Sequence, residues 1–504
     1  MEMKKQFILT LCIVTPMLAA CSLSFERDGF VDAYMSSEAL AVSEVEGPEV
    51  PVSGDQFDPI KENAFIRTAD EPVSTFSVDA DGAAYAYMRR CLQDNFLPNR
   101  NSVRIEEYLN YFTFGYADPT GAETLAINAE IAACPWAEGH ALLRLGLKGK
   151  SLTDSQIPAA NYIFLIDTSG SMCGDDRIDL LKKGLTTMLD YMKPTDRVAI
   201  ITYSGSVSKA LESTLVSDAA KIKKVINKLQ ASGCTAGGDA MKMAYDEAVA
   251  HYITGGNNRI IMCTDGDFNV GVSSTEALVE MVESYLDKGI YLSIMGFGTG
   301  NFQDSRMENL SNHGNGTYTY IDSEEEMMKV FVNERSHFYS VANDTKCQVT
   351  FDPAAVESYR LIGYENRLMS KEDFENEKKD AGEIGAGQTI TALYEIVPAE
   401  GFKAGVAAAR FDVRYKKALG GESRPLTLQA AVPADLTKMS ADMGLAAGIT
   451  AYGLCLRDSE YKGSATLPMA RDLVAGSVQD DRYGLRSQLL TLMERASRLK
   501  QYAE

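Results

Sequence analysis

The sequence predicts an α/β protein with a doubly wound, mainly parallel sheet, flanked by β-rich and helical regions. Between residues 158 and 340, short apolar segments alternate with amphipathic ones, as in buried parallel strands covered by helices on both faces. The neighbouring regions contain strand-like segments, and the chain ends in leucines at helical spacing. The 504 residues allow about three to four domains, and 45% hydrophobic with 24% charged residues is a globular composition.

Composition excludes several classes of protein. The chain has 49 Lys and Arg against 70 Asp and Glu, a formal net charge of −21, which disfavours nucleic-acid binding. There are only four histidines, and none falls in a metal-ligand spacing such as HExxH. There is no GxSxG motif either. We therefore do not expect an enzyme.

Residues 1–20 are expected to be a signal peptide. Lys4 and Lys5 precede the apolar run Phe7–Ala20, which is 14 residues long and shorter than the ~20 that a transmembrane helix needs. The run ends in Leu-Ala-Ala-Cys21, which resembles the lipobox of bacterial lipoproteins and implies lipidation of Cys21. The alternative is a plain signal peptide with an incidental cysteine.

Residues 21–62 are expected to form an acidic, extended tether after the lipidated cysteine. Nine acidic residues and one basic residue lie between residues 22 and 60, among many small and polar residues, so little surface can be buried. Ser22 favours outer-membrane sorting by analogy with enteric bacteria. We therefore expect a lipid-anchored cell-envelope protein, with a periplasmic or surface-exposed position left open.

Residues 63–150 form the N-terminal flanking region, with strands expected at Leu125–Ala133 and Ala141–Leu147. Asp79 and Asp81 occur in the sequence VDADG just before a helix expected at Ala83–Cys91. They either cap that helix or belong to a calcium-binding turn, and the cap is favoured.

The α/β domain is placed at residues 158–340. Its expected strands are Tyr162–Ile166, Arg197–Tyr203, Arg259–Thr264, Ile290–Phe297 and Thr317–Ile321. Its expected helices are Asp176–Met192, Asp218–Leu229, Asp239–Tyr252, Ser274–Asp287, Ser305–Asn312 and one that begins at Ser323.

Three loops of this domain carry oxygen ligands. Asp167, Ser169 and Ser171 follow the first strand, Thr235 lies in a glycine-rich loop, and Asp265 follows the strand RIIMCT. The carboxyl ends of parallel strands meet at one sheet edge, where ligands bind. Carboxylates and hydroxyls are hard ligands that suit Mg²⁺.

The DxSxS motif, the distant Thr and the Thr-Asp-Gly together resemble the metal-ion-dependent adhesion site of von Willebrand factor type A (VWA) domains. The resemblance implies a Rossmann-like VWA fold and a site of Asp167, Ser169, Ser171, Thr235 and Asp265. It also implies a divalent cation, Mg²⁺ or else Mn²⁺ or Ca²⁺, completed by an acidic side chain of an unknown partner protein.

Further segments resemble a class of bacterial VWA lipoproteins whose functions are mostly not established. These segments are Asn63–Asp118, Gly266–Ser274 and Val349–Pro398. The expected function is therefore metal-dependent binding of a partner protein at the cell envelope. The alternatives are a scaffold with a stabilising metal and, less favoured, a metal-assisted hydrolase with Asp267 as base. Gly296–Gly300 approaches a dinucleotide motif, but its third glycine is misplaced.

Nine cysteines are present, without a CxxC pair. Cys263 is expected in the core. A disulfide between Cys173 and Cys234 across the metal loops is one alternative, and two free thiols are the other.

Residues 341–432 are β-rich, and residues 433–504 are helical. The expected strands are Cys347–Phe351, Ser358–Ile362, Thr389–Val397 and Val406–Tyr415. These strands and those of residues 124–150 either form one sandwich, with the VWA domain inserted, or two separate units. The leucines near the C-terminus favour a helix docked on the body over a dimerisation strip. Oligomeric state stays open.

Overall fold

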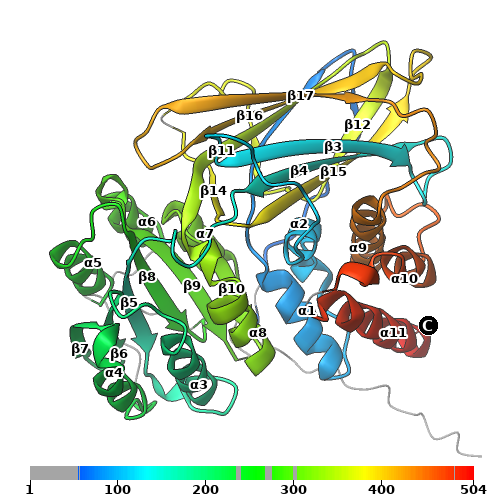
Figure 1. The fold of residues 1–504 in the computed structure, drawn as a ribbon. Coiled ribbons are helices and arrows are strands. Elements are labelled where there is room, and N and C mark those ends of the chain that lie inside the picture. The colour runs from blue at the N-terminus through cyan, green and yellow to red at the C-terminus, as the bar shows by residue number, and fades with distance from the viewer. Residues whose placement is uncertain are drawn as a thin grey trace, which may run out of the picture. The chain divides into compact units, whose positions relative to one another are not determined.

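The computed structural model describes residues 55, 57–233, 240–266, 275–298, 304–377, 379–481 and 483–503. Within this part of the chain, three sheets and the helices that pack with them are arranged as Figure 1 shows. A parallel sheet with its helices, drawn in green, lies beside an antiparallel β-sandwich, and the C-terminal helices, drawn in brown to red, pack under the end of the sandwich.

The parallel sheet confirms the predicted fold class. Its strands are β5 (Ala160–Asp167), β6 (Arg197–Tyr203), β7 (Val207–Leu215), β8 (Asn257–Thr264), β9 (Tyr291–Phe297) and β10 (Tyr318–Ile321). They lie in the order β10-β9-β8-β5-β6-β7, and every pair is parallel except β6 with β7. The sequence did not predict β7, an edge strand with mostly polar residues.

Helices cover both faces of this sheet because alternate strand residues point to opposite sides. The helices are α3 (Ile178–Leu189), α4 (Ala219–Ile226), α5 (Ala240–Ala250), α6 (Thr275–Glu283), α7 (Asp304–His313) and α8 (Glu324–Met328). Ile163 and Leu165 of β5 pack in one apolar cluster with α5, α6 and α7. Phe164 and Ile166 pack in the other cluster, with α3 and α4.

The sandwich consists of two antiparallel sheets. One contains β1 (Ile66–Arg67), β12 (Val356–Ile362), β15 (Thr389–Pro398), β4 (Ala141–Gly149) and β3 (Leu125–Ala133), in that order. The other contains β13 (Leu368–Met369), β2 (Val73–Ser77), β11 (Ser340–Phe351), β16 (Ala407–Lys416) and β17 (Ser423–Ala431), with β14 (Gly382–Gly385) paired to β11. Inward-facing residues such as Phe76, Leu145, Tyr394 and Phe411 form their common core.

The parallel sheet is inserted into the sandwich, since β5–β10 lie in sequence between β4 and β11. The two connections meet at one turn. The Gly387 N–H donates to the carbonyl of Lys150, just past β4, at 3.1 Å, and the Ala386 N–H donates to the carbonyl of Tyr339, just before β11, at 2.8 Å. The segment that leaves the sandwich and the segment that returns to it are therefore fixed side by side.

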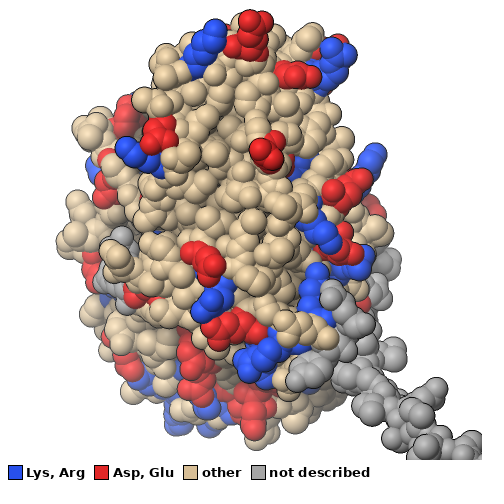
Figure 2. All heavy atoms as spheres, turned by 90° about the vertical axis from the view of Figure 1, so that its right-hand side faces the viewer, with Lys and Arg blue, Asp and Glu red and all other residues tan. Residues whose placement is uncertain are grey.

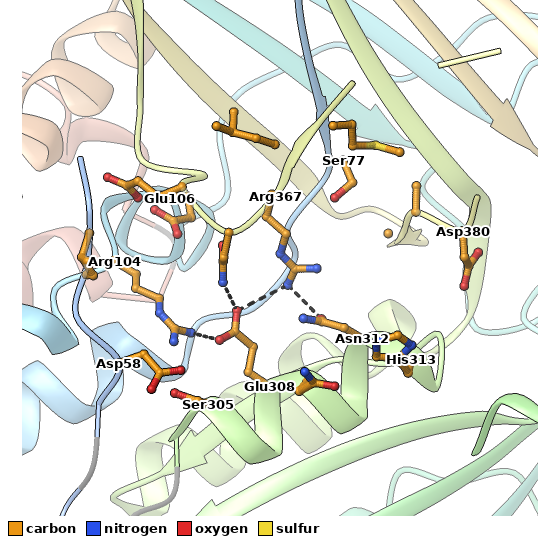
Figure 3. A pocket seen from close by; sticks show the side chains of 18 of the residues that line it. Asp58, Ser77, Arg104, Glu106, Ser305, Glu308, Asn312, His313, Arg367 and Asp380 are labelled. Carbon is orange, nitrogen blue, oxygen red and sulfur yellow. Dashed lines mark hydrogen bonds and ion pairs between the residues drawn. The ribbon is translucent and has the colours of Figure 1, made fainter. Parts of the chain in front are cut away.

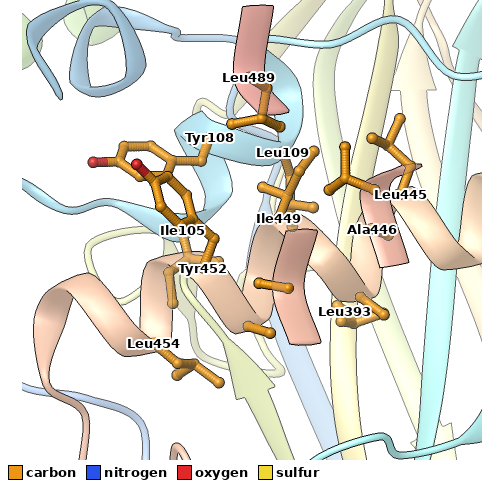
Figure 4. Packing of buried hydrophobic residues seen from close by; sticks show 14 of the residues in the cluster. Ile105, Tyr108, Leu109, Leu393, Leu445, Ala446, Ile449, Tyr452, Leu454 and Leu489 are labelled. Carbon is orange, nitrogen blue, oxygen red and sulfur yellow. The ribbon is translucent and has the colours of Figure 1, made fainter. Parts of the chain in front are cut away.

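The terminal helices share a core with the N-terminal region. α1 (Ala83–Gln93) and α2 (Ile105–Asn110) pack with α9 (Ala441–Arg457), α10 (Leu467–Ala475) and α11 (Leu485–Ala503). Figure 4 shows Leu489 of α11 beside Tyr108 and Leu109 of α2 and Ile449 of α9. The buried face of α11 agrees with the expected docked helix.

Charges of both signs are interspersed on the face that Figure 2 shows, so no continuous patch of one sign is seen there. Among the helices that the structure describes, none is both long enough and apolar enough to cross a membrane.

Candidate metal site

The first loop of the site begins where β5 ends. Asp167, the last residue of β5, is 0% exposed. Its Oδ1 accepts a hydrogen bond from the Ser169 backbone N–H at 2.8 Å, and its Oδ2 accepts one from the Thr264 hydroxyl at 3.4 Å. The two donors hold the two carboxylate oxygens separately, so the orientation of the carboxylate is fixed.

Two serine hydroxyls lie together just beyond this carboxylate. Ser169 Oγ and Ser171 Oγ are 2.9 Å apart. Ser169 is buried, whereas Ser171 is exposed. The turn Gly170–Met172 between β5 and α3 is anchored by the fully buried Met172. The side-chain oxygens of this loop therefore extend from the buried Asp167 through Ser169 to the exposed Ser171.

Asp265 lies at the same edge, one strand away. β8 is paired in parallel with β5, with Cys263 level with Ile166, so Asp265 follows the end of the adjacent strand. Its exposure is 6%. Burial, together with repulsion from Asp265, raises the pKa of Asp167 to about 6. The two carboxylates are thus close enough for the charge of Asp265 to disfavour ionisation of Asp167.

The segment that leads to Thr235 touches the first loop. The Ser232 N–H donates to the Thr168 carbonyl at 2.8 Å, and the Gly170 N–H donates to the Gly233 carbonyl at 3.0 Å. Gly233 is the last described residue before Thr235. Thr235 itself lies outside the described residues, and its assignment stays a prediction.

The described donors fit a divalent cation. Asp167 and Asp265 supply carboxylates, and Ser169 and Ser171 supply neutral hydroxyls, all of them hard oxygen ligands. A cation would also offset the mutual repulsion of the two carboxylates. When bound, it would supply a positive centre that accepts a further oxygen from outside.

The remaining predicted residues are only partly described. Cys173 is exposed and forms no disulfide with another described cysteine, and Cys263 is fully buried as expected, with its pKa raised by burial. Cys234 and Cys21 lie outside the described residues, so the Cys173–Cys234 disulfide and the lipidation remain predictions. Asp267, the base considered for a hydrolase, and part of the glycine motif at 296–300 lie outside them too.

The helix-cap prediction for Asp79 and Asp81 was wrong. The residue that caps α1 is Gly82, without a side-chain hydrogen bond, and the carboxylate of Glu107 accepts the Ala84 N–H at 2.7 Å instead. Arg367 holds both aspartates, with its Nε 3.2 Å from Asp79 Oδ2 and its Nη2 3.2 Å from Asp81 Oδ2.

Asp79, Asp81 and Glu308 form a separate cluster in which three carboxylate oxygens lie within 4.8 Å of one another. Arg367 faces all three carboxylates, and Arg104 also pairs with Glu308. The guanidinium groups of Arg367 and Arg104 thus balance the negative charge of this cluster. These ion pairs account for the positions of Asp79 and Asp81 without the calcium-binding turn considered above. Nothing in the sequence links Glu308 to the two aspartates, because it lies more than 220 positions away from them.

The fold and the oxygen ligands at the carboxyl edge of its parallel sheet define a VWA-domain protein, and the comparisons agree. The model of the von Willebrand factor type A domain matches residues 162–267, and one described as von Willebrand factor matches residues 51–144. A third, described as the C-terminal part of the uncharacterized protein YfbK, matches residues 336–499.

The chain belongs to the YfbK family. It is 35% identical over 468 residues to the uncharacterized protein YfbK of Escherichia coli strain K12, covering 88% of this chain and 80% of that protein. It is also 28% identical over 259 residues to inter-alpha-trypsin inhibitor heavy chain H3 of Pongo abelii, covering 47% of this chain but 29% of the relative. A solved VWA protein from Catenulispora acidiphila, 18% identical, covers 73% of this chain and 90% of its own, with a TM-score of 0.40.

Proposed function

We propose that this protein is a lipid-anchored cell-envelope protein that binds a partner protein through a divalent cation, Mg²⁺ or a similar ion. The ligands would be Asp167, Ser169, Ser171, Thr235 and Asp265. The observation that supports this most directly is the position of Asp265 beside the buried Asp167 at the carboxyl edge of the sheet.

The donor set explains why a partner would be required. Two carboxylates and neutral hydroxyls do not saturate an ion that prefers six oxygen ligands. The exposed Ser171 marks the side from which a further ligand would arrive. An acidic side chain is the oxygen ligand that best matches the remaining positive charge, and the loops around it would select the partner by shape.

Isothermal titration of Mg²⁺ and Mn²⁺ into the full chain tests the metal site. We expect saturable binding in the wild type, loss of binding in Asp265→Ala, and unchanged binding in Asp287→Ala, which removes an exposed carboxylate elsewhere in the same domain. Circular dichroism should show that both variants keep their fold. Unchanged affinity in Asp265→Ala would contradict the assignment.

Water proton relaxation by bound Mn²⁺ separates recognition from a purely stabilising metal. If the ion has a position open to a partner, adding a peptide with a glutamate side chain should displace bound water and lower the relaxation enhancement. The same peptide with glutamine is the control. A metal that binds with no response to either peptide would favour the scaffold alternative.

The anchor is tested independently of the metal. Intact-mass measurement of the membrane-extracted protein should show the mass of an acylated Cys21, and Cys21→Ser should move the protein to the soluble fraction. Membrane association that survives Cys21→Ser would contradict the lipid anchor and leave the metal site unaffected.

A further inference from the structure

A pocket of about 550 Å³ lies where α7 of the VWA domain faces the sandwich and the N-terminal region. Figure 3 shows its walls: Glu106 and Arg104 on one side, α7 with Glu308 and Asn312 below, and Asp380 opposite Glu106. None of the described residues of the metal site lines it. Its properties are therefore separate from the function proposed above.

One carboxyl oxygen in this wall lacks a hydrogen-bond donor. Glu106 is the second residue of α2 and is 1% exposed, yet its Oε2 has no hydrogen-bond donor among the described residues. The backbone of Gly363, with φ +75°, packs against it so closely that a Cβ there would lie 2.5 Å from Oε2. A buried polar atom without a partner is uncommon in native proteins and calls for an explanation.

The surroundings of Glu106 are short of positive charge. Burial, the neighbouring Glu365 and Asp79 raise the pKa of Glu106 to about 8, and Arg457 opposes them. Arg457 is already engaged, because its Nη1 lies 2.6 Å from Glu365 and 3.2 Å from Glu62. One guanidinium thus faces three carboxyl groups.

The other two guanidinium groups near Glu106 are engaged elsewhere. Arg367 pairs with Asp79 and Asp81, and Arg104 pairs with Glu107 and Glu308. Among the described residues of the wall, the ionised form of Glu106 therefore has no cation of its own.

The rest of the lining suits an aliphatic chain with a polar end. Ile60, Leu368 and Met369 supply apolar surface, and Asn309 and Asn312 of α7 supply polar groups. Lys61 and Lys379 are exposed at the pocket and would contact solvent or an anionic end of a ligand.

We propose that this pocket binds an aliphatic primary ammonium, with the Glu106 carboxylate as the group that receives it. An ammonium supplies both the hydrogen-bond donor and the positive charge that Glu106 lacks. A neutral hydroxyl would supply only the donor, and an anion would be repelled. The ammonium belongs either to a free diamine or to a lysine side chain, which share this chemistry.

Calorimetric titration of the full chain in EDTA tests this, with 1,5-diaminopentane, Nα-acetyl-lysine amide and 1-pentanol as probes. We expect the two amines to bind and the neutral 1-pentanol not to compete. The tighter of the two amines identifies the source of the ammonium. Because Glu106, with its pKa raised to about 8, is largely protonated at neutral pH, binding of an ammonium should release a proton. Titration in two buffers of different ionisation enthalpy detects this release.

Two variants and a control make the test specific. Glu106→Gln keeps the shape but removes the charge, and should weaken amine binding about tenfold or more and abolish the proton release. Asn309→Trp, at an exposed position of α7, should block the pocket without touching Glu106. Glu357→Gln, on the exposed face of β12, should change nothing. Amine binding equal to wild type in Glu106→Gln, or no amine binding to the wild type, would overturn the proposal.

Discussion

Replacing Asp167 by Asn is expected to stabilise the metal-free VWA domain at neutral pH. In the folded chain, burial and Asp265 raise the pKa of this carboxyl from 3.8 to about 6, which corresponds to about 3 kcal/mol. The Asn side chain keeps an oxygen for the Ser169 N–H and has no charge to bury.

The direction in which stability changes with pH follows from proton linkage. Between about pH 4 and pH 6 the folded state holds a proton on Asp167 that the unfolded state has lost, so stability falls as the pH rises through this window. At pH 7.5 the folded metal-free wild type bears the whole free-energy cost of the buried, ionised Asp167, whereas at pH 4 it bears little of this cost. The variant should therefore gain up to about 3 kcal/mol over wild type at pH 7.5 and little at pH 4.

Hydrogen exchange measured on peptides that cover β5 is a suitable assay, because it reports the free energy of local opening in this domain alone. Both proteins are compared at pH 4 and pH 7.5 in EDTA, after correction for intrinsic exchange rates, with Asp287→Asn as the surface control. Saturating Mg²⁺ should then slow exchange in wild type but not in Asp167→Asn. A difference between wild type and variant that is the same at both pH values would refute the reasoning.

Two further predictions concern the packing of the domain. Arg89→Met removes the guanidinium that donates to the buried Asp322 and Glu326 at 2.5–2.7 Å, and should lower the free energy of unfolding by about 3–5 kcal/mol. Calorimetry should show a clearly lower melting temperature, and an unchanged melting temperature would contradict this account. Gly316→Ala places a Cβ 1.7 Å from the Leu292 carbonyl oxygen, so β10 must move away from β9 at a cost of about 1–3 kcal/mol in the free energy of unfolding. A variant as stable as wild type in the same scan would contradict this prediction and show that the backbone there moves at little cost.

The VWA sheet was predictable because its strands are apolar on both faces. Segments such as Tyr162–Ile166 contain only large apolar residues, and the helices between them show a clear helical period. β7 was missed for the opposite reason: it is an edge strand with exposed residues such as Lys209 and Glu212. Only Leu211 and Thr214 of its sequence VSKALESTL are buried, and they show no regular alternation. Its pairing with β6 depends on the tertiary fold.

The position of the candidate site was predictable because its loops follow parallel strands, whose carboxyl ends meet at one edge of the sheet. Asp167, Ser169 and Ser171 occupy one loop, and the structure brings Asp265 to the same edge through the pairing of β5 with β8. Thr235 lies outside the described residues. Contacts that join distant segments left no signal, and the roles of Asp79 and Asp81 were therefore misassigned: the Arg367 guanidinium that binds them comes from more than 280 positions away.

The shared turn at Gly385–Gln388 has a mechanical consequence for the inserted domain. Because Lys150 and Tyr339 are both hydrogen-bonded to this turn, the domain is attached through two adjacent chain segments. A single linker would let the domain swivel, whereas two parallel attachments resist torque. A pull on a ligand held at the edge of the sheet would be divided between β4 and β11, so that neither connection carries the whole tension.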